Sequence, residues 1–176
     1  LDDIVIRRVS LTGGDHHLSD IPGSAHYINP KTLDKFNYHD INRILYMIPG
    51  VNLQEEDGFG LRPNIGIRGA GSERSSKITL MEDGVLMAPA PYAAPAAYYF
   101  PNSGRMKGIE IRKGSSQIKY GPYTTGGALN MISTPVPREL TLNTRLSAGN
   151  FGFRDAYAQV GQTFGRFGIM AEAMNT

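Results

Sequence analysis

The sequence predicts an α+β fold in two parts, a domain of short helices and strands followed by a set of antiparallel strands. Three observations lead to this prediction. Apolar residues recur at helical spacing around residue 45, glycine-rich turns separate short β-prone segments between residues 51 and 134, and alternation of apolar and polar residues begins after Pro137. The 21 glycines among 176 residues suit a chain with many turns.

Two segments in the first part are predicted to be helices. Asn29 is a candidate N-cap, and Pro30 follows it at a favourable first helical position. The segment "HDINRILYMIPG" carries an apolar stripe at positions i, i+3, i+4 and i+7, formed by Ile41, Ile44, Leu45 and Ile48. Pro49 and Gly50 end this helix. We interpret its stripe as a packing face.

Short strands are predicted between glycine-rich turns, whereas residues 12–24 are predicted to form a loop. The predicted strands are residues 51–54, 64–68, 77–81, 106–114 and 128–134, with a tight turn at Asp83–Gly84. In "MKGIEIRKG", Ile109 and Ile111 alternate with Glu110 and Arg112. This alternation predicts a half-buried strand.

After Pro137 the chain alternates apolar and polar residues in three consecutive segments. One face of these segments carries Leu140, Leu142, Leu146 and Ala148, then Ala156, Ala158, Val160 and Phe164, then Phe167, Ile169, Ala171 and Ala173. Such segments are typical of transmembrane β-barrel strands, and also of a soluble antiparallel sheet with one wet face. The pattern alone leaves both open. If the strands cross a membrane, three cannot close a barrel and a longer protein is expected.

Composition and motifs exclude several classes of function. The absence of cysteine excludes disulfides and thiol catalysis, and a formal charge of +2 without a basic patch does not predict nucleic-acid binding. No spacing predicts a metal site, and no cofactor motif is complete. No set of residues supplies nucleophile, base and orienting group. A hydrolase using an acid such as Glu110 is therefore disfavoured, and we predict that the protein is not an enzyme.

Residues 85–104 form an uncharged segment that contains four prolines and four aromatic residues. Proline removes backbone donors and disfavours both helix and central strand. The aromatic residues are unusual for a disordered linker. Long irregular segments within compact domains are commonly functional, so we interpret this one as a functional loop.

Several stretches in combination resemble the plug domain of TonB-dependent outer-membrane receptors. They are "LDDIVI", "DINRILYMIPGVN", "NIGIRG", "ITLMEDGV", "IEIRKGS" and "YGPYTTGGALNMIST". They occur in the order and spacing of the family over about 135 residues. Within the family, "NIGIRG" and "LMEDGVLMAPAPY" are most similar to the ferric-dicitrate branch.

The resemblance implies a tether in residues 1–10, a plug domain in residues 11–137 and the first two to three strands of a truncated β-barrel in residues 138–176. The plug is expected to be an α+β globule with a small mixed four-stranded sheet, seated in a barrel of about 22 strands. The implied function is uptake of a ferric chelate, such as ferric citrate or another siderophore complex, across the bacterial outer membrane. The chelate is cargo and no cofactor is implied. The alternative is a free-standing soluble α+β ligand-binding module.

The resemblance also implies sites. A segment at Asp3, Ile4, Val5 and Ile6 would pair as a strand with the energy-transducing protein TonB. Arg68 and Lys113 would lock the plug to glutamates of its own barrel. Ligand contacts are expected on two apical loops, from Arg62, Arg74, Lys77, Tyr92, Tyr98 and Tyr99.

Two further expectations follow from the same resemblance. Ala94 and Ala96 stand where dicitrate receptors carry glutamines that donate to the ligand, which weakens dicitrate as the cargo. Without the rest of the barrel, the third barrel strand is expected to pair abnormally or to be disordered, and the fragment is expected to self-associate through exposed strand edges.

Overall fold

The computed structural model describes residues 11–12, 18, 21, 23–87, 99–114, 120–121 and 123–176. The chain divides into two compact units, Leu1–Ser133 and Thr134–Thr176. The boundary between them precedes the expected boundary after Pro137. Each unit is built around its own sheet.

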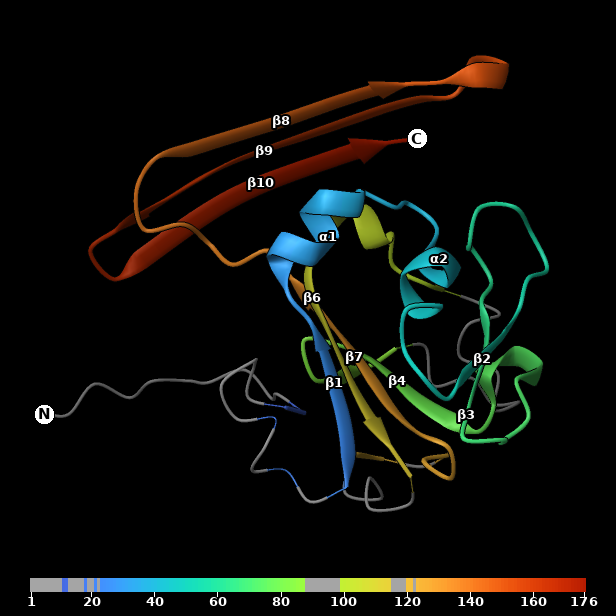
Figure 1. Cartoon of the computed structure of the whole chain (residues 1–176). Helices are drawn as coiled ribbons and strands as arrows, with labels where there is room; N and C mark the ends of the chain where they lie inside the picture. Colours follow the sequence, from blue (N-terminus) through green and yellow to red (C-terminus); the bar gives the residue numbers. More distant parts are fainter. Residues whose placement is uncertain are drawn as a thin grey trace, which may run out of the picture. The chain divides into compact units, whose positions relative to one another are not determined.

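The first unit contains a five-stranded mixed sheet in the order β1-β6-β7-β4-β5 (Figure 1). Its strands are β1 (Ser24–Ile28), β4 (Ile78–Glu82), β5 (Val85–Leu86), β6 (Met106–Lys113) and β7 (Gly127–Ser133). β6 is antiparallel to both of its neighbours, β1 and β7. β4 is parallel to β7 and forms a hairpin with β5 through the predicted turn at Asp83–Gly84.

Among its described residues, the first unit also contains two short α-helices and a second small sheet. They are α1 (Pro30–Phe36), α2 (Ile41–Leu45) and the antiparallel pair of β2 (Val51–Gln54) with β3 (Asn64–Ile67). The Asn29 side chain caps α1 by accepting from the Thr32 backbone N–H at 2.9 Å. The apolar stripe of α2 packs into one core with Ile109 and Leu129 of the large sheet. The stripe therefore fixes which face of that sheet the helices cover.

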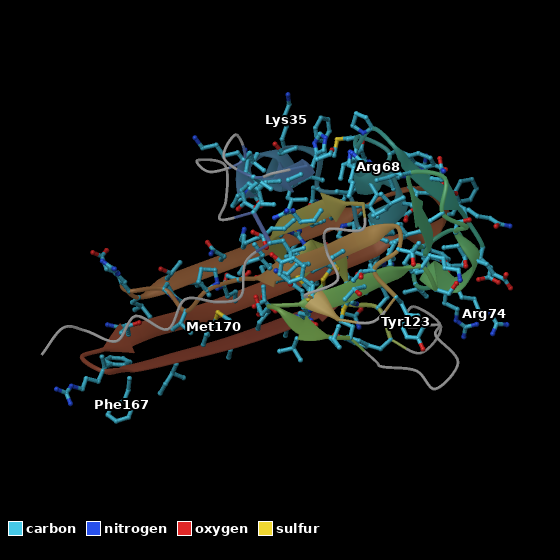
Figure 2. The ribbon with its side chains drawn as sticks, turned by 90° about the horizontal axis from the view of Figure 1, so that it is seen from below. Lys35, Arg68, Arg74, Tyr123, Phe167 and Met170 are labelled. Atoms are coloured by element: carbon cyan, nitrogen blue, oxygen red, sulfur yellow. The ribbon has the colours of Figure 1, made fainter. Side chains whose placement is uncertain are left out.

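The second unit is a three-stranded antiparallel sheet in the order β10-β9-β8. Its strands are β8 (Thr141–Ala148), β9 (Arg154–Phe164) and β10 (Phe167–Asn175). The apolar face is exposed, since Leu146 is 82% and Phe167 78% accessible, whereas Asp155 and Gln159 on the opposite face are each 3% accessible. Figure 2 shows Phe167 projecting outward from its strand. Short 3-10 turns occur at Glu73–Ser75, Ser103–Arg105 and Asn150–Gly152.

The α+β fold predicted from the sequence is confirmed, with a short fifth strand added to the expected four. One strand was not predicted, and two other expectations were wrong. Residues 24–28 form strand β1, which no sequence pattern had indicated. β6 is not half-buried, because Glu110 (0% accessible) and Arg112 (8%) are covered as well as the two isoleucines. The third strand, β10, pairs with β9 in regular register over its whole length rather than abnormally.

Candidate functional site

Two of the predicted ligand residues, Arg62 and Arg74, lie near the start of β3, where Asn64 links their loops. The Asn64 side chain accepts from the Arg74 backbone N–H at 2.8 Å and donates to the Gln54 carbonyl at 3.2 Å. It also donates to the Glu56 carboxylate at 3.3 Å. Both arginines are exposed. Asn64 therefore joins the loop before β3 to the turn that follows that strand.

Asp57 organises the loop that presents Arg62. Its carboxylate accepts from the backbone N–H groups of Phe59 (2.9 Å), Leu61 (3.1 Å) and Arg62 (3.0 Å). Burial alone would raise the pKa of Asp57, but these bonds and one from Gly60 hold the pKa below its ordinary value. The loop consequently presents Phe59 (68% accessible) and Leu61 (62%) to solvent beside Arg62.

Of the other two described ligand candidates, Tyr99 does not join this group. Lys77 immediately precedes the first residue of β4 and is exposed. Tyr99 lies at the opposite end of β4, where its hydroxyl contacts the Glu82 carboxylate and the Arg105 guanidinium, each at 3.2 Å. Arg105 also forms an ion pair with Glu82. Tyr92, Tyr98 and the partner segment at residues 3–6 lie outside the described residues, as do Ala94 and Ala96.

The two predicted lock residues, 45 positions apart in sequence, lie close together at the end of β6. A Cβ atom on Gly114, the residue after Lys113, would lie 3.0 Å from the Arg68 guanidinium. Arg68 itself has a left-handed backbone (φ 53°), and its N–H donates to the Gly50 carbonyl at 2.9 Å. In Figure 2, Arg68 and Arg74 lie in separate parts of the first unit.

Lys113 is a buried cation in an unfavourable electrostatic environment. The residue is 4% accessible, and its ammonium group donates to the Pro49 carbonyl. Burial and the nearby charge of Arg68 both lower the pKa of Lys113. Burial, and then the charge of Lys113, lower the pKa of the neighbouring His26. Within the described part of the chain, the ion pairs are Arg105–Glu82, Lys107–Asp34 and Arg145–Asp155, so neither lock residue has a carboxylate partner there.

This basic pair can bind an anionic partner supplied from elsewhere. A buried charge without a counter-ion costs free energy, and a carboxylate close to both groups would offset that cost. The arrangement of Arg68, Lys113 and Gly114 is therefore suited to docking against acidic side chains.

Sequence reasoning missed a second group of buried polar residues, on the face of the large sheet opposite the helices. Glu110, Arg112, Asn130 and Thr79 are each 8% accessible or less. The alternation in β6 placed Glu110 and Arg112 on one face, but nothing in the local pattern indicated that other residues cover that face. Glu110 accepts hydrogen bonds from several donors, an arrangement unlike that of a free catalytic acid.

The described residues contain neither a metal-binding cluster nor a membrane-spanning helix. Nowhere among them do three or more His, Asp or Glu side chains gather as they would to hold a metal ion. Their helices are all too short, or not apolar enough, to cross a membrane.

Comparison with known proteins extends these observations. Residues 17–128 match the family described as TonB-dependent Receptor Plug Domain. The vitamin B12 transporter BtuB of Vibrio vulnificus (strain CMCP6) is 22% identical over 153 residues, which cover 87% of this chain and 24% of that protein.

Solved structures share the fold. The ferric citrate transporter FecA in its unliganded form matches with a TM-score of 0.71 and 23% identity, covering 92% of this chain and 27% of that one. The ferripyoverdine receptor of the outer membrane of Pseudomonas aeruginosa matches with a TM-score of 0.67 and 18% identity, covering 84% and 19%.

A match to 92% of the chain must include strands of the second unit, so both the plug and the strands after it share the receptor fold. The chain spans about a quarter of the length of BtuB and FecA. On the family match over residues 17–128, the chain belongs to the TonB-dependent receptor plug domain family of outer-membrane receptors.

Proposed function

We propose that the chain is the plug and the first barrel strands of an outer-membrane transporter that takes up a ferric chelate and is energised by TonB from the inner membrane. The observation that carries this proposal is the sheet of the second unit, which we call inverted because its apolar face is exposed and polar residues of its other face are buried. Its exposed face carries Leu142, Leu146 and Ile169, whereas Asp155 and Gln159 are covered. Lipid stabilises an exposed apolar face of this kind, which in water would favour aggregation.

The basic pair supports a plug that docks inside a barrel. Arg68 and Lys113 approach each other at the end of β6 without a carboxylate partner among the described residues. Glutamates on the inner wall of the barrel would supply the missing charge. Because Lys113 forms point contacts rather than the two parallel bonds of an arginine, this lock should be looser than one made by two arginines.

A ferric chelate is the proposed cargo. BtuB is named as a vitamin B12 transporter and FecA as a ferric citrate transporter, and the Pseudomonas receptor is bound to ferripyoverdine. The loops that carry Arg62 and Arg74 also carry acidic residues: the Asp57 carboxylate accepts from the Arg62 backbone N–H, the Glu56 carboxylate accepts from the Asn64 side chain, and Glu73 precedes Arg74 in the sequence. These negative charges do not favour binding of a strongly anionic complex at the two arginines. We therefore propose, as the cargo, a siderophore complex with less negative charge than ferric dicitrate.

The partner contact is proposed for residues 3–6, which lie outside the described residues. An extended, β-branched segment can add as a strand to the edge of a partner's sheet through main-chain hydrogen bonds. Asp3, Ile4, Val5 and Ile6 fit this mode of binding to TonB.

The test is a titration of the full-length receptor with ferric dicitrate, a ferric hydroxamate, a ferric catecholate and cyanocobalamin, followed by uptake assays with and without TonB. We expect saturable binding of one ferric complex and uptake that requires TonB. Binding of cyanocobalamin alone would replace iron with vitamin B12 as the cargo. A protein that is soluble without detergent would instead support the free-standing binding module.

A further inference from the structure

The face of the large sheet opposite the helices has a buried carboxylate at its centre. Glu110 of β6 is fully inaccessible and lies in register with Tyr27 of β1 and Asn130 of β7. The Asn130 side chain donates to the Glu110 carboxylate at 2.9 Å and accepts from the Gly84 N–H at 2.8 Å. An ionised side chain in this position needs several donors to offset its loss of water.

A short segment near the start of the chain supplies these donors. The backbone N–H groups of Leu11 and Thr12 donate to the two carboxylate oxygens of Glu110 at 2.8 and 3.3 Å. The Thr12 hydroxyl donates to the same carboxylate at 2.9 Å. Arg112, two residues along β6, donates in turn to the Leu11 carbonyl at 3.2 Å. The segment is thus held by charge-assisted hydrogen bonds, which are stronger than neutral ones.

Apolar contacts add to this attachment. Leu11 is 3% accessible and packs with Met81 and Ala128 in a small cluster on this face, beside Tyr120. Leu11 and Thr12 themselves form a bend rather than part of a strand. The attachment therefore depends on side chains of the sheet and not on a ladder of backbone pairs.

This mode of attachment has a mechanical consequence. A segment held by side chains can detach while β1, β6, β7 and β4 stay paired, because no strand pair of the sheet includes Leu11 or Thr12 among the described residues. After detachment, water can solvate Glu110 and Arg112, which lowers the cost of leaving them without their protein partners. Detachment from an apolar site would not be compensated in this way, because water does not solvate apolar side chains favourably.

We infer that Glu110 is a positioning residue that anchors the start of the plug to its sheet, and that separation of Leu11 and Thr12 from Glu110 precedes disruption of the sheet. In the transporter, the anchor follows the segment proposed to bind TonB, residues 3–6, after four intervening residues, so a pull on that segment is expected to reach the anchor before the sheet. This last step rests on the proposed function, whereas the anchor itself does not.

Hydrogen exchange on the full-length receptor tests the anchor. Glu110→Gln keeps the size of the side chain but removes its charge and replaces one acceptor oxygen with a donor. We expect exchange at the Leu11 and Thr12 amides to become about 10- to 100-fold faster, with β7 still protected. Glu55→Gln, at an exposed position, removes the same charge and should leave both regions unchanged.

Thr12→Val provides a milder second variant, because it removes only the hydroxyl donor. It should accelerate the same two amides by less than Glu110→Gln does, without affecting β6 or β7. Unchanged exchange at Leu11 and Thr12 in both variants would overturn the anchor. Equal acceleration across the whole sheet would also overturn it, since Glu110 would then act as an ordinary core residue.

Pulling single receptor molecules from the N-terminus tests the mechanical step. The first rupture force should be lower in Glu110→Gln than in the parent protein, and Glu55→Gln should match the parent. An unchanged first rupture would refute the proposed order of events. Chelate binding measured on the same samples separates the two proposals, because a receptor that binds no ferric complex contradicts only the proposed cargo.

Discussion

The two sheets of this protein use the same alternation of apolar and polar residues to opposite effect. In the first unit, Ile109, Ile111 and Leu129 are inaccessible, and the polar side chains of the opposite face are covered as well. In the second unit, Leu142 and Leu146 are exposed and the polar residues Asp155 and Gln159 are covered. Alternation therefore shows that a strand has two different faces, but not which face meets solvent, lipid or protein.

The two units also differ in the partners of their buried charged side chains. The Arg145 side chain in the second unit lies 3.7 Å from the Asp155 carboxylate, within the same sheet. Lys113 in the first unit is buried beside a second cation and bonded to a backbone carbonyl. The second unit neutralises its buried carboxylate internally, whereas the buried Lys113 of the first unit has no carboxylate partner among the described residues.

The largest expected effect is the difference in stability, measured in water, between substitutions on the two apolar faces. Leu129→Ala in β7 should lower the free energy of unfolding by about 2–5 kcal/mol, because it leaves a cavity in a closed core. Leu146→Ala in β8 removes the same atoms from an exposed position and should change it by less than about 0.5 kcal/mol. Chemical denaturation of the purified chain measures both, and equal effects would contradict the inverted sheet.

In lipid, by contrast, the exposed apolar face of the second unit should be sensitive to substitution by a charged residue. Leu146→Lys should destabilise the full-length receptor in vesicles by about 2–4 kcal/mol if residue 146 lies near the bilayer midplane. Asn143→Lys, on the opposite face of the same strand, is the matched control and should cost much less. Folding yield into vesicles is the measurement, and similar yields for both variants would show that β8 does not contact lipid.

A smaller effect concerns the buried cation. The folded state lowers the pKa of Lys113 below the ordinary 10.5, so the unfolded chain binds this proton more tightly. The free energy of unfolding of the chain should therefore rise as pH increases toward 10.5 through the lowered value. Lys113→Met should remove this part of the pH dependence, whereas Lys31→Met, on the exposed face of α1, should retain it.

The smallest effect is local to the loop before β3. Asp57→Asn should free the backbone N–H groups of Phe59, Leu61 and Arg62 with little change in global stability, which amide chemical shifts can detect. Because the folded pKa of Asp57 lies below 3.8, the closed loop should persist above that pH and open only as pH falls through the lower value. A loop that opens above pH 4 would show that these bonds do not control it.

Most elements of the first unit could be predicted because their signals are local. The Asn29–Pro30 start of α1, the stripe of α2 and the Asp83–Gly84 turn are each set by neighbouring residues. Strand β1 was missed because "SAHYI" has neither strict alternation nor a run of β-branched residues, and its pairing with β6 depends on residues about 85 positions away. Non-local pairing of this kind leaves no local signal.

The candidate sites were predictable only in part, for the same reason. Arg68 and Lys113 could be named from the family resemblance, but their proximity arises from the fold. The covering of Glu110 by Leu11 and Thr12 joins residues about 100 positions apart, so β6 was interpreted as half-buried. Tyr99 could be assigned to a loop, but its contact with Glu82 at the far end of β4 depends on the path of the chain after β5.

The parallel pairing of β4 with β7 affects how the protein is made. Ile78 meets Gly127, and Ile28 of β1 meets Ile109, so the central strands of the sheet are synthesised well after the strands they join. Sheets with such distant pairings fold slowly. Until β6 and β7 have been synthesised, β1 and β4 expose unpaired hydrogen-bonding edges. Refolding of the first unit should accordingly take longer than its size alone suggests, and its yield should fall as protein concentration rises.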